Sequence, residues 1–348
     1  MRSNRLVAGS VLMLATLGLG ACGGGQGTTR DQVRAVGSST VYPFAKAVAE
    51  SLAKADATIK APIIESTGTG AGMKLFCAGI GPQHPDIEDA SRRMKKSEFD
   101  ECVKNGVKEI VEIQVGLDGV AFAEGNNGPG IALTPEDVYK ALAKNPFGKP
   151  QTAKSWKDVN PALPDEPILV YGPPSTSGTR DALKELILTR GCESDPAMKA
   201  LKDSDKSKHD AICSAVREDG AYVDAGENDN LIVQKIEANP KAIGIFGFSY
   251  LEENRDRLKG LLMSGVNPTY ETITDFSYPG ARPLYIYVKK AHLKAIPGLQ
   301  AYVNEWSKLW SKGGVLAKAG MVIAPDDVLT ASAKAASELP VLDGAQLK

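Results

Sequence analysis

Three stretches of the sequence place hydroxyl and glycine residues directly before an apolar pattern of helical spacing. They read GSSTVYPFAKAVAE at residues 37–50, STGTGAGMKLF from Ser66 and STSGTRDALKEL from Ser175. One hydroxyl is enough to cap a helix, yet each stretch carries several. Helix N-terminal N–H groups, rotatable Ser and Thr hydroxyls and closely approaching Gly backbone are the donors that an oxyanion requires. The three stretches together therefore predict a shared oxyanion site.

A fourth segment, DIEDASRRMKKSEF, adds hydroxyl and guanidinium groups after a short predicted strand. Arg180 lies in a first helical turn, where a cation opposes the helix dipole unless an anion is nearby. An Arg fork can also hold two anion oxygens at once. Helix capping explains any single loop, but it does not explain all of them with the arginines attached. The predicted donors are Ser39, Thr40, the Val41 backbone, Thr69, Ser91, Arg92, Ser177, Gly178, Thr179 and Arg180.

Apolar runs alternate with helical patterns along the chain, which is typical of α/β architecture. Two extended segments, 116–130 and 265–283, are suited to cross between two lobes as a hinge. This organisation predicts a discontinuous first lobe, 31–117 plus 284–348, and a second lobe, 118–283. Strands are expected at 32–37, 61–66, 109–124, 166–172, 242–249 and 282–290, and helices include 97–106, starting at Ser97, and one capped by Thr134.

The N-terminus has the pattern of an export signal. Arg2 and Arg5 precede an apolar stretch that is too short for a good membrane span and ends in LGAC, with Cys22 followed by glycines. Small residues before a single Cys are typical of a bacterial lipobox, which predicts a signal peptide at 1–21, lipidation of Cys22 and a flexible tether at 22–30. The alternative is an ordinary secretory signal with a chance Cys.

Five cysteines are present, and lipidation of Cys22 would leave four in an oxidising compartment. Three connectivities are open to them. We favour Cys77 with Cys102 and Cys192 with Cys213, because each pair would close a loop of roughly 20–25 residues within one lobe. A metal site is the weaker alternative, because no C-x-x-C pair occurs and the three histidines are scattered.

Composition narrows the function classes. The formal net charge of −1 gives no overall basic field for nucleic acid or anionic lipid, so any anion affinity must come from a local site. An exported phosphatase or serine hydrolase finds little support, because there is no G-x-S-x-G elbow, no phosphate-binding G-x-x-x-x-G-K-[ST] loop and no clustered metal ligands. We therefore expect a binding protein without catalysis, metal or other cofactor.

The segments GSSTVYPF, STGTGAGMK, DIEDASRRMK, STSGTRDAL and KAIGIFGFSYL resemble, in order, the successive motifs of the periplasmic phosphate-binding proteins of phosphate-specific ABC transporters, the PstS family. The resemblance covers almost all of the mature chain. It implies a type II periplasmic binding fold, two α/β lobes that close on one phosphate in the cleft between them, and it maps the ligand contacts onto the donors named above. It further implies an exported, membrane-anchored monomer that docks on permease subunits.

Two positions depart from that family's pattern. Some members carry an Asp where this chain has Arg92, and that Asp accepts the ligand's proton to distinguish phosphate from sulfate. The same members place an Arg where this chain has Pro173. A receptor for another oxyanion, such as sulfate, molybdate or tungstate, is therefore the alternative, and a surface lipoprotein that signals through a partner is a further one.

Overall fold

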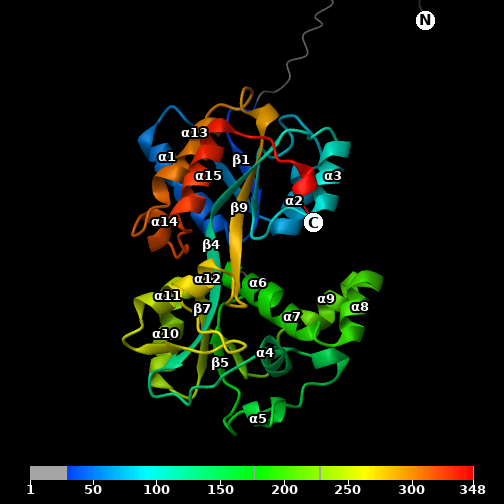
Figure 1. Cartoon of the computed structure of the whole chain (residues 1–348), viewed down its shortest axis with the longest axis vertical. Helices are drawn as coiled ribbons and strands as arrows, with labels where there is room; N and C mark the ends of the chain where they lie inside the picture. Colours follow the sequence, from blue (N-terminus) through cyan, green and yellow to red (C-terminus); the bar gives the residue numbers. More distant parts are fainter. Residues whose placement is uncertain (1–29, 176, 227–228, 348) are drawn as a thin grey trace, which may run out of the picture.

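Two long antiparallel strands, β4 (Ile110–Gly125) and β9 (Ala281–Lys289), run side by side between the two halves of the molecule (Figure 1). The computed structural model describes residues 30–175, 177–226 and 229–347. The predicted signal peptide, Cys22 and the tether up to residue 29 lie outside these residues. Strand pairing between β4 and β9 extends from Ile110 opposite Lys289 to Gly119 opposite Ala281. Both halves are thus built on the same pair of strands.

The first half, upper in Figure 1, is a sheet with helices on both faces. The strand order β2-β1-β3-β9-β4 places three short strands beside the two long ones. One face packs against α1 and α13 around Val48, Ile286 and Trp306, and the other packs against α2 and α3 around Phe76 and Tyr287. Its elements are β1 (Arg34–Gly37), α1 (Tyr42–Ala55), β2 (Ile63–Ser66), α2 (Thr69–Phe76), β3 (Ile87–Ala90), α3 (Lys96–Lys104), α13 (Leu299–Leu309), α14 (Val315–Lys318), α15 (Asp326–Glu338) and the 3₁₀ turns Lys290–His292 and Gly344–Gln346.

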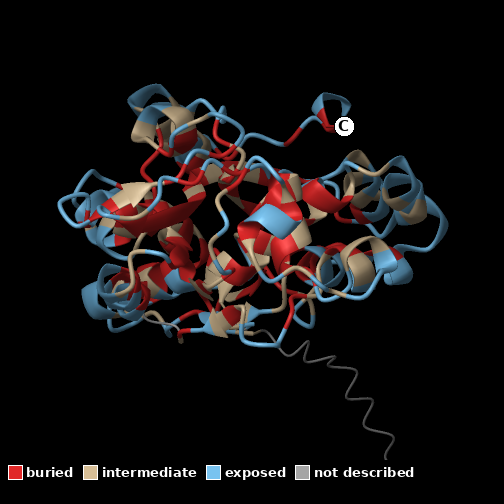
Figure 2. Cartoon of the chain, turned by 90° about the horizontal axis from the view of Figure 1, so that it is seen from below, coloured by how far each residue is buried: buried red, intermediate tan, exposed pale blue. Residues whose placement is uncertain are grey.

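The second half has its own sheet, in the order β4-β7-β5-β6, with β8 also paired to β4. Its core contains Phe122, Trp156 and Phe246, and Figure 2 shows buried residues in red within exposed helices and loops. Its elements are α4 (Pro135–Leu142), the 3₁₀ turn Pro146–Gly148, α5 (Trp156–Val159), β5 (Val170–Gly172), α6 (Gly178–Ala182), a π-helical segment (Leu183–Leu188), α7 (Thr189–Cys192), α8 (Pro196–Ser204), α9 (Lys206–Cys213), β6 (Tyr222–Asp224), α10 (Asp229–Ala238), β7 (Ile243–Gly247), α11 (Phe248–Glu253), β8 (Leu258–Gly260) and α12 (Tyr270–Thr274).

Local sequence signals account for most element boundaries. Thr134 caps α4 as expected, because its side chain accepts the N–H of Asp137 and Pro135 opens the helix. The expected start of the helix at Ser97 is wrong. The Glu98 carboxylate instead accepts the backbone N–H of Lys95 at 2.9 Å, so α3 begins at Lys96. The strand expected at 166–172 is shorter, Val170–Gly172.

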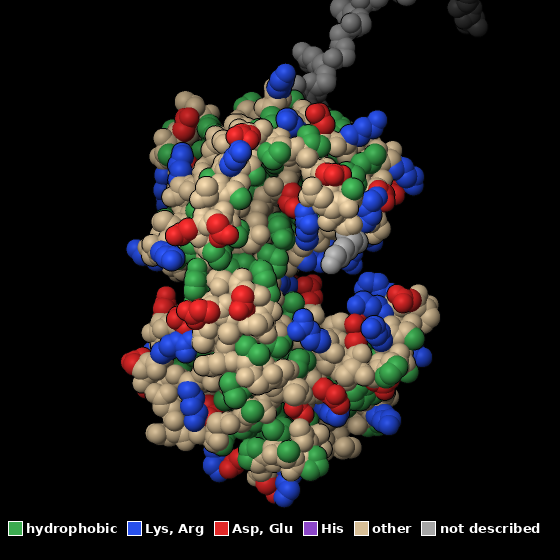
Figure 3. Space-filling model, in the orientation of Figure 1, with side chains coloured by type: hydrophobic (Ala, Val, Ile, Leu, Met, Phe, Trp, Pro, Cys, Tyr) green, Lys and Arg blue, Asp and Glu red, His purple; other side chains and the backbone are tan. Residues whose placement is uncertain are grey.

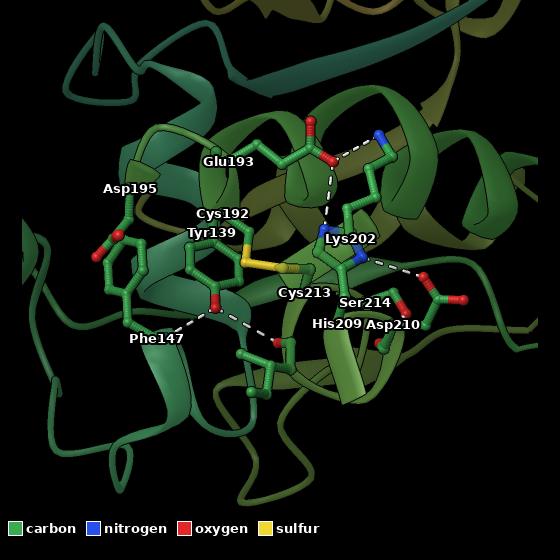
Figure 4. The surroundings of a disulfide bond; sticks show 12 residues. Tyr139, Phe147, Cys192, Glu193, Asp195, Lys202, His209, Asp210, Cys213 and Ser214 are labelled. Atoms are coloured by element: carbon green, nitrogen blue, oxygen red, sulfur yellow. Dashed lines mark hydrogen bonds and ion pairs between the residues drawn. A yellow bond between two sulfur atoms is a disulfide. The ribbon is translucent and has the colours of Figure 1, made fainter. Parts of the chain in front are cut away.

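The structure contains the two disulfides that the sequence favoured, Cys77–Cys102 and Cys192–Cys213. The first joins α2 to α3 in the upper half. The second joins α7 to α9 in the lower half and lies beside the Tyr139 ring (Figure 4). Both bonds are buried and each closes a short loop within one half.

Removing the Cys192–Cys213 bond by Cys192→Ala with Cys213→Ala should destabilise the protein without changing ligand binding. The bond closes a loop of 21 residues, and the loss of that constraint on the unfolded chain is worth about 3 kcal/mol. Urea unfolding would show the lower free energy of unfolding. An equal stability of the variant and the wild type would contradict a structural role for this bond.

Within the ranges that the structure describes, no helix is both long and apolar enough to traverse a bilayer.

Candidate functional site

Four of the predicted loops begin at the carboxyl ends of parallel strands, which is where open α/β sheets bind ligands. Gly37 ends β1 and lies opposite Ser66 of β2 and Asp89 of β3, so three loops of the upper half start side by side. The Gly37 carbonyl accepts the N–H groups of Thr67 and Gly68 at 2.8 and 2.7 Å. Gly37 itself has φ +133°, which favours glycine. In the lower half, the Ser177 loop follows β5.

The three hydroxyls of the first loop, those of Ser38, Ser39 and Thr40, have different hydrogen-bond partners. The Ser38 hydroxyl oxygen accepts the N–H groups of Thr40 at 3.1 Å and Val41 at 3.4 Å. Ser38 therefore serves the start of α1, which leaves Ser39 and Thr40 to face the other half. The Val41 N–H, predicted as a ligand donor, is used by Ser38 in this structure.

Ser39 and Thr40 contact the lower half directly. The Thr40 hydroxyl donates to the Gly178 carbonyl at 3.1 Å, and the Ser39 hydroxyl donates to the Asp181 carboxylate. A Cβ placed on Gly178 would lie 2.4 Å from the Thr40 Cα, so only glycine permits this approach. The two halves thus meet where the sequence placed the site.

A cleft of about 460 Å³ lies beside this contact and is lined by residues of both halves. Five of the predicted donors line it: Ser39, Thr40, Ser177, Gly178 and Thr179. The Ser177 hydroxyl oxygen accepts the Thr179 N–H at 3.2 Å, so the loop is ordered by its own side chain. The lower-half loop and the first loop therefore converge on one cavity.

Thr69 and Ser91 form a second pair of hydroxyls in the upper half. Their oxygens are 3.1 Å apart, and the Ser91 N–H donates to the Thr69 hydroxyl at 3.1 Å. Both residues are buried. The structure brings them together at the start of α2, but neither is among the residues lining the cleft described above.

The two predicted arginines point to partners within their own halves. Arg92 forms a bidentate pair with Glu98 of α3, at 2.9 and 2.7 Å. Arg180 is buried, donates to the Pro173 carbonyl at 3.1 Å and stacks with its guanidinium 4.2 Å from the centre of the Tyr222 ring. Burial raises the pKa of Tyr222 to about 12. Neither arginine lines the cleft.

Sequence reasoning missed a third arginine, Arg282, at the start of β9. Its Nη2 donates to the Thr40 hydroxyl at 2.7 Å, and its Nε to Asp118 at 3.1 Å. Its Nη1 donates to Glu185 at 2.6 Å. The signal for it in the sequence was its position, because Arg282 lies at the end of the predicted crossing segment 265–283 and therefore near any cleft between the lobes.

Two neighbouring carboxyl groups lie buried in β3, and the side chain of one of them, Glu88, reaches the predicted oxyanion-binding loops of the upper half. A Cβ on Gly37 or Gly72 would lie 2.8 or 2.2 Å from a Glu88 carboxyl oxygen, so Glu88 fits between these glycines. Burial, followed by the neighbouring Asp89, raises the pKa of Glu88 well above its usual value. Burial raises the pKa of Asp89 to about 8. Burial therefore favours the protonated, neutral form of both groups.

The site has the chemistry of oxyanion binding. The cleft is lined by hydroxyls and backbone N–H groups together with the carboxylates of Asp118 and Asp229, and the buried Arg282 guanidinium contacts the lining residue Thr40. In Figure 3 the surface is notched between the two halves near α3 and α8, and both basic and acidic side chains lie along the notch. The residues that line the cleft instead include residues of α1, of α11 and of the segment after α14. Among the described residues, no group of three or more His, Cys, Asp or Glu side chains is arranged to hold a metal ion.

A two-lobed α/β fold with a polar cleft beside its crossing strands defines the class of type II periplasmic binding proteins. A family model described as a PBP superfamily domain matches residues 24–307. The phosphate-binding protein PstS of Staphylococcus saprophyticus is 32% identical over 329 residues, which cover 91% of this chain and 89% of the relative. The chain therefore belongs to the PBP superfamily and, within it, to the PstS family.

Other similar proteins agree with this membership. Protein SphX of Synechococcus elongatus is 32% identical over 87% of this chain and 80% of its own length. The crystal structure of a possible phosphate binding protein from Planctomyces limnophilus matches with a TM-score of 0.68 at 28% identity, covering 88% of this chain and 98% of that one. An ABC-type phosphate transport receptor from Vibrio cholerae shares the fold, with a TM-score of 0.57 at 19% identity, covering 84% of this chain and 99% of that one.

Proposed function

We propose that this protein captures inorganic phosphate in the cleft between its lobes and delivers it to the permease of an ABC transporter. The observation that carries the proposal is the meeting of Ser39 and Thr40 with the Ser177–Thr179 loop at one cavity. Donors from two lobes enclose a tetrahedral anion more completely than donors from one. The names of the similar proteins, PstS and a possible phosphate binding protein, support the same ligand.

Binding would proceed without chemical change of the ligand. An open form would admit the anion, and rotation of the lobes about β4 and β9 would bring the two sets of donors together. The lobe boundaries that we propose for this motion are those of the sequence, 31–117 plus 284–348 against 118–283. Helix dipoles at the ends of the loops would stabilise the anion, and the Ser39 and Thr40 hydroxyls would turn from Asp181 and Gly178 to donate to it. None of the described histidines lines the cleft.

The cellular setting is part of the proposal. Export by the signal peptide, cleavage before Cys22 and lipidation of that residue would anchor a monomer at the outer face of a membrane. The glycine-rich tether would let the binding domain reach the permease subunits. Radiolabelled lipid incorporation into the wild type and into Cys22→Ala would test the anchor.

Isothermal titration of the mature, ligand-stripped protein with phosphate tests the function. We expect tight binding of one phosphate per chain that persists in a large excess of sulfate. Because Arg92 stands where some family members carry an Asp, discrimination against sulfate must come from other groups. Displacement of phosphate by sulfate, molybdate or tungstate would assign the protein to another oxyanion. No binding of any of these would contradict the proposal.

A further inference from the structure

Arg282 lies where the two lobes and the crossing strands meet. It is the second residue of β9 and pairs in register with Asp118 of β4. These are the strands that run between the halves in Figure 1. The residue is only 4% exposed, so its charge is held away from bulk water. A buried cation is costly unless anionic groups compensate it.

Each edge of the Arg282 guanidinium reaches a different part of the molecule. Nε contacts Asp118 of the crossing strand, at 3.1 Å, and Nη1 contacts Glu185 of the lower half, at 2.6 Å. Nη2 contacts the Thr40 hydroxyl of the upper half, at 2.7 Å. Because Thr40 lines the cleft, an anion bound at its hydroxyl would lie within reach of Nη2.

The charge balance around the cleft requires such a cation. Asp118 lines the cavity, Asp181 accepts the Ser39 hydroxyl, and Glu185 lies beside Arg282. A phosphate entering among these carboxylates would be repelled unless a positive group stood next to it. The arginines predicted from the sequence are turned to Glu98 and to Tyr222, whereas Arg282 contacts a cleft residue directly.

We propose that Arg282 binds the phosphate from the crossing strand, and that Glu185 is the carboxylate which phosphate displaces from its guanidinium. The two carboxylate partners of Arg282 differ in exposure, and this difference determines which of them phosphate displaces from the guanidinium. The Asp118 side chain is 15% exposed and stays paired, whereas the Glu185 side chain is 55% exposed and returns to water at little cost. Glu185 thus competes with the ligand and sets its affinity. This inference rests on the proposed function.

The test is a double-mutant cycle measured by phosphate titration. Arg282→Gln should weaken phosphate binding roughly 10- to 100-fold, the range expected for a hydrogen bond to a charged group. Glu185→Gln should tighten binding by about 3- to 10-fold, because the competing carboxylate is gone. In the Arg282→Gln background the Glu185→Gln change should raise affinity clearly less than in the wild type, since there is no guanidinium left to compete for and only the repulsion by Glu185 is removed.

Arg217→Gln is the matched control. Arg217 is also buried, pairs with Asp219 at 2.7 and 2.6 Å and lies in the lower half away from the cleft. It should lower the melting temperature yet leave phosphate affinity unchanged. If Arg282→Gln fails to fold, Arg282→Lys retains a charge for Asp118 but loses the fork, and it should bind phosphate about 10-fold more weakly.

The outcomes separate this inference from the function on which it rests. A wild type that does not bind phosphate overturns the proposed function. A wild type that binds phosphate, with folded Arg282→Gln or Arg282→Lys binding it equally well, overturns the role of Arg282 alone. Weaker or unchanged binding by Glu185→Gln overturns the role of Glu185 as the competing carboxylate, and so does an equal gain in both backgrounds.

Discussion

Replacing Gly178 with alanine should weaken phosphate binding by 100-fold or more while leaving each lobe folded. The added Cβ would lie 2.4 Å from the Thr40 Cα and 2.6 Å from its backbone nitrogen. These contacts are with backbone of the opposite half, which no side-chain rotation can relieve. The φ of Gly178 is not positive, so alanine is compatible with its own backbone conformation. The change therefore acts on the approach of the lobes and on little else.

Two measurements check this expectation. Titration calorimetry gives the loss of affinity, and small-angle X-ray scattering reports whether phosphate still reduces the radius of gyration. The ligand-free melting temperature of Gly178→Ala should stay close to that of the wild type, because an open form has room for the methyl group. Near-normal affinity, with compaction on adding phosphate, would show that the ligand is bound without the Thr40–Gly178 approach.

The positions of the loops could be predicted from the sequence because they depend on local signals. Apolar strands followed by hydroxyl and glycine residues indicated where β1, β2 and β5 end. Parallel pairing then sets Gly37 opposite Ser66 and Asp89. The type of fold followed from the same alternation of strands and helices, together with the resemblance to a known family.

The roles of individual side chains could not be predicted in the same way. Ser38 and Ser39 are adjacent and chemically identical. The conformation of the turn alone determines that Ser38 binds the start of α1 and that Ser39 faces Asp181. The contact of Arg282 with Thr40 joins residues 242 positions apart. Such a contact depends on how two lobes pack, for which a single sequence holds no local pattern.

Arg92 illustrates a different limit. Its residue type and position favoured an anion contact, and the structure satisfies its fork with Glu98 instead. A second interaction holds Glu98 in place, because its carboxylate also accepts the Lys95 N–H at the start of α3. A helix boundary one residue earlier than expected and an arginine turned away from the cleft thus have a common cause.

Asp89→Asn should make the protein more stable near pH 8 and remove part of the loss of stability on raising the pH. The side chain is fully buried, and its Oδ1 has no hydrogen-bond partner among the described residues. Burial raises its pKa to about 8 in the folded protein, against about 3.9 in an unfolded chain. The folded state therefore holds a proton that the unfolded state releases. Stability is full below about pH 4 and falls between about pH 4 and pH 8.

The size of the effect follows from the shift. Each pKa unit corresponds to about 1.4 kcal/mol, so the full difference is at most about 5 kcal/mol at pH 8. Asparagine has the shape of the protonated carboxyl group and carries no proton to lose. Urea unfolding of both proteins from pH 4 to pH 8 should give curves that coincide at the acid end and diverge toward pH 8. A slope will persist in the variant, because the pKa of buried Glu88 is also raised.

The exposed Asp203→Asn change is the control and should leave the wild-type curve unaltered. Parallel curves for Asp89→Asn and the wild type would mean that Asp89 is ionised in the fold, and a negative charge would then lie in β3 next to the loops that we propose bind phosphate.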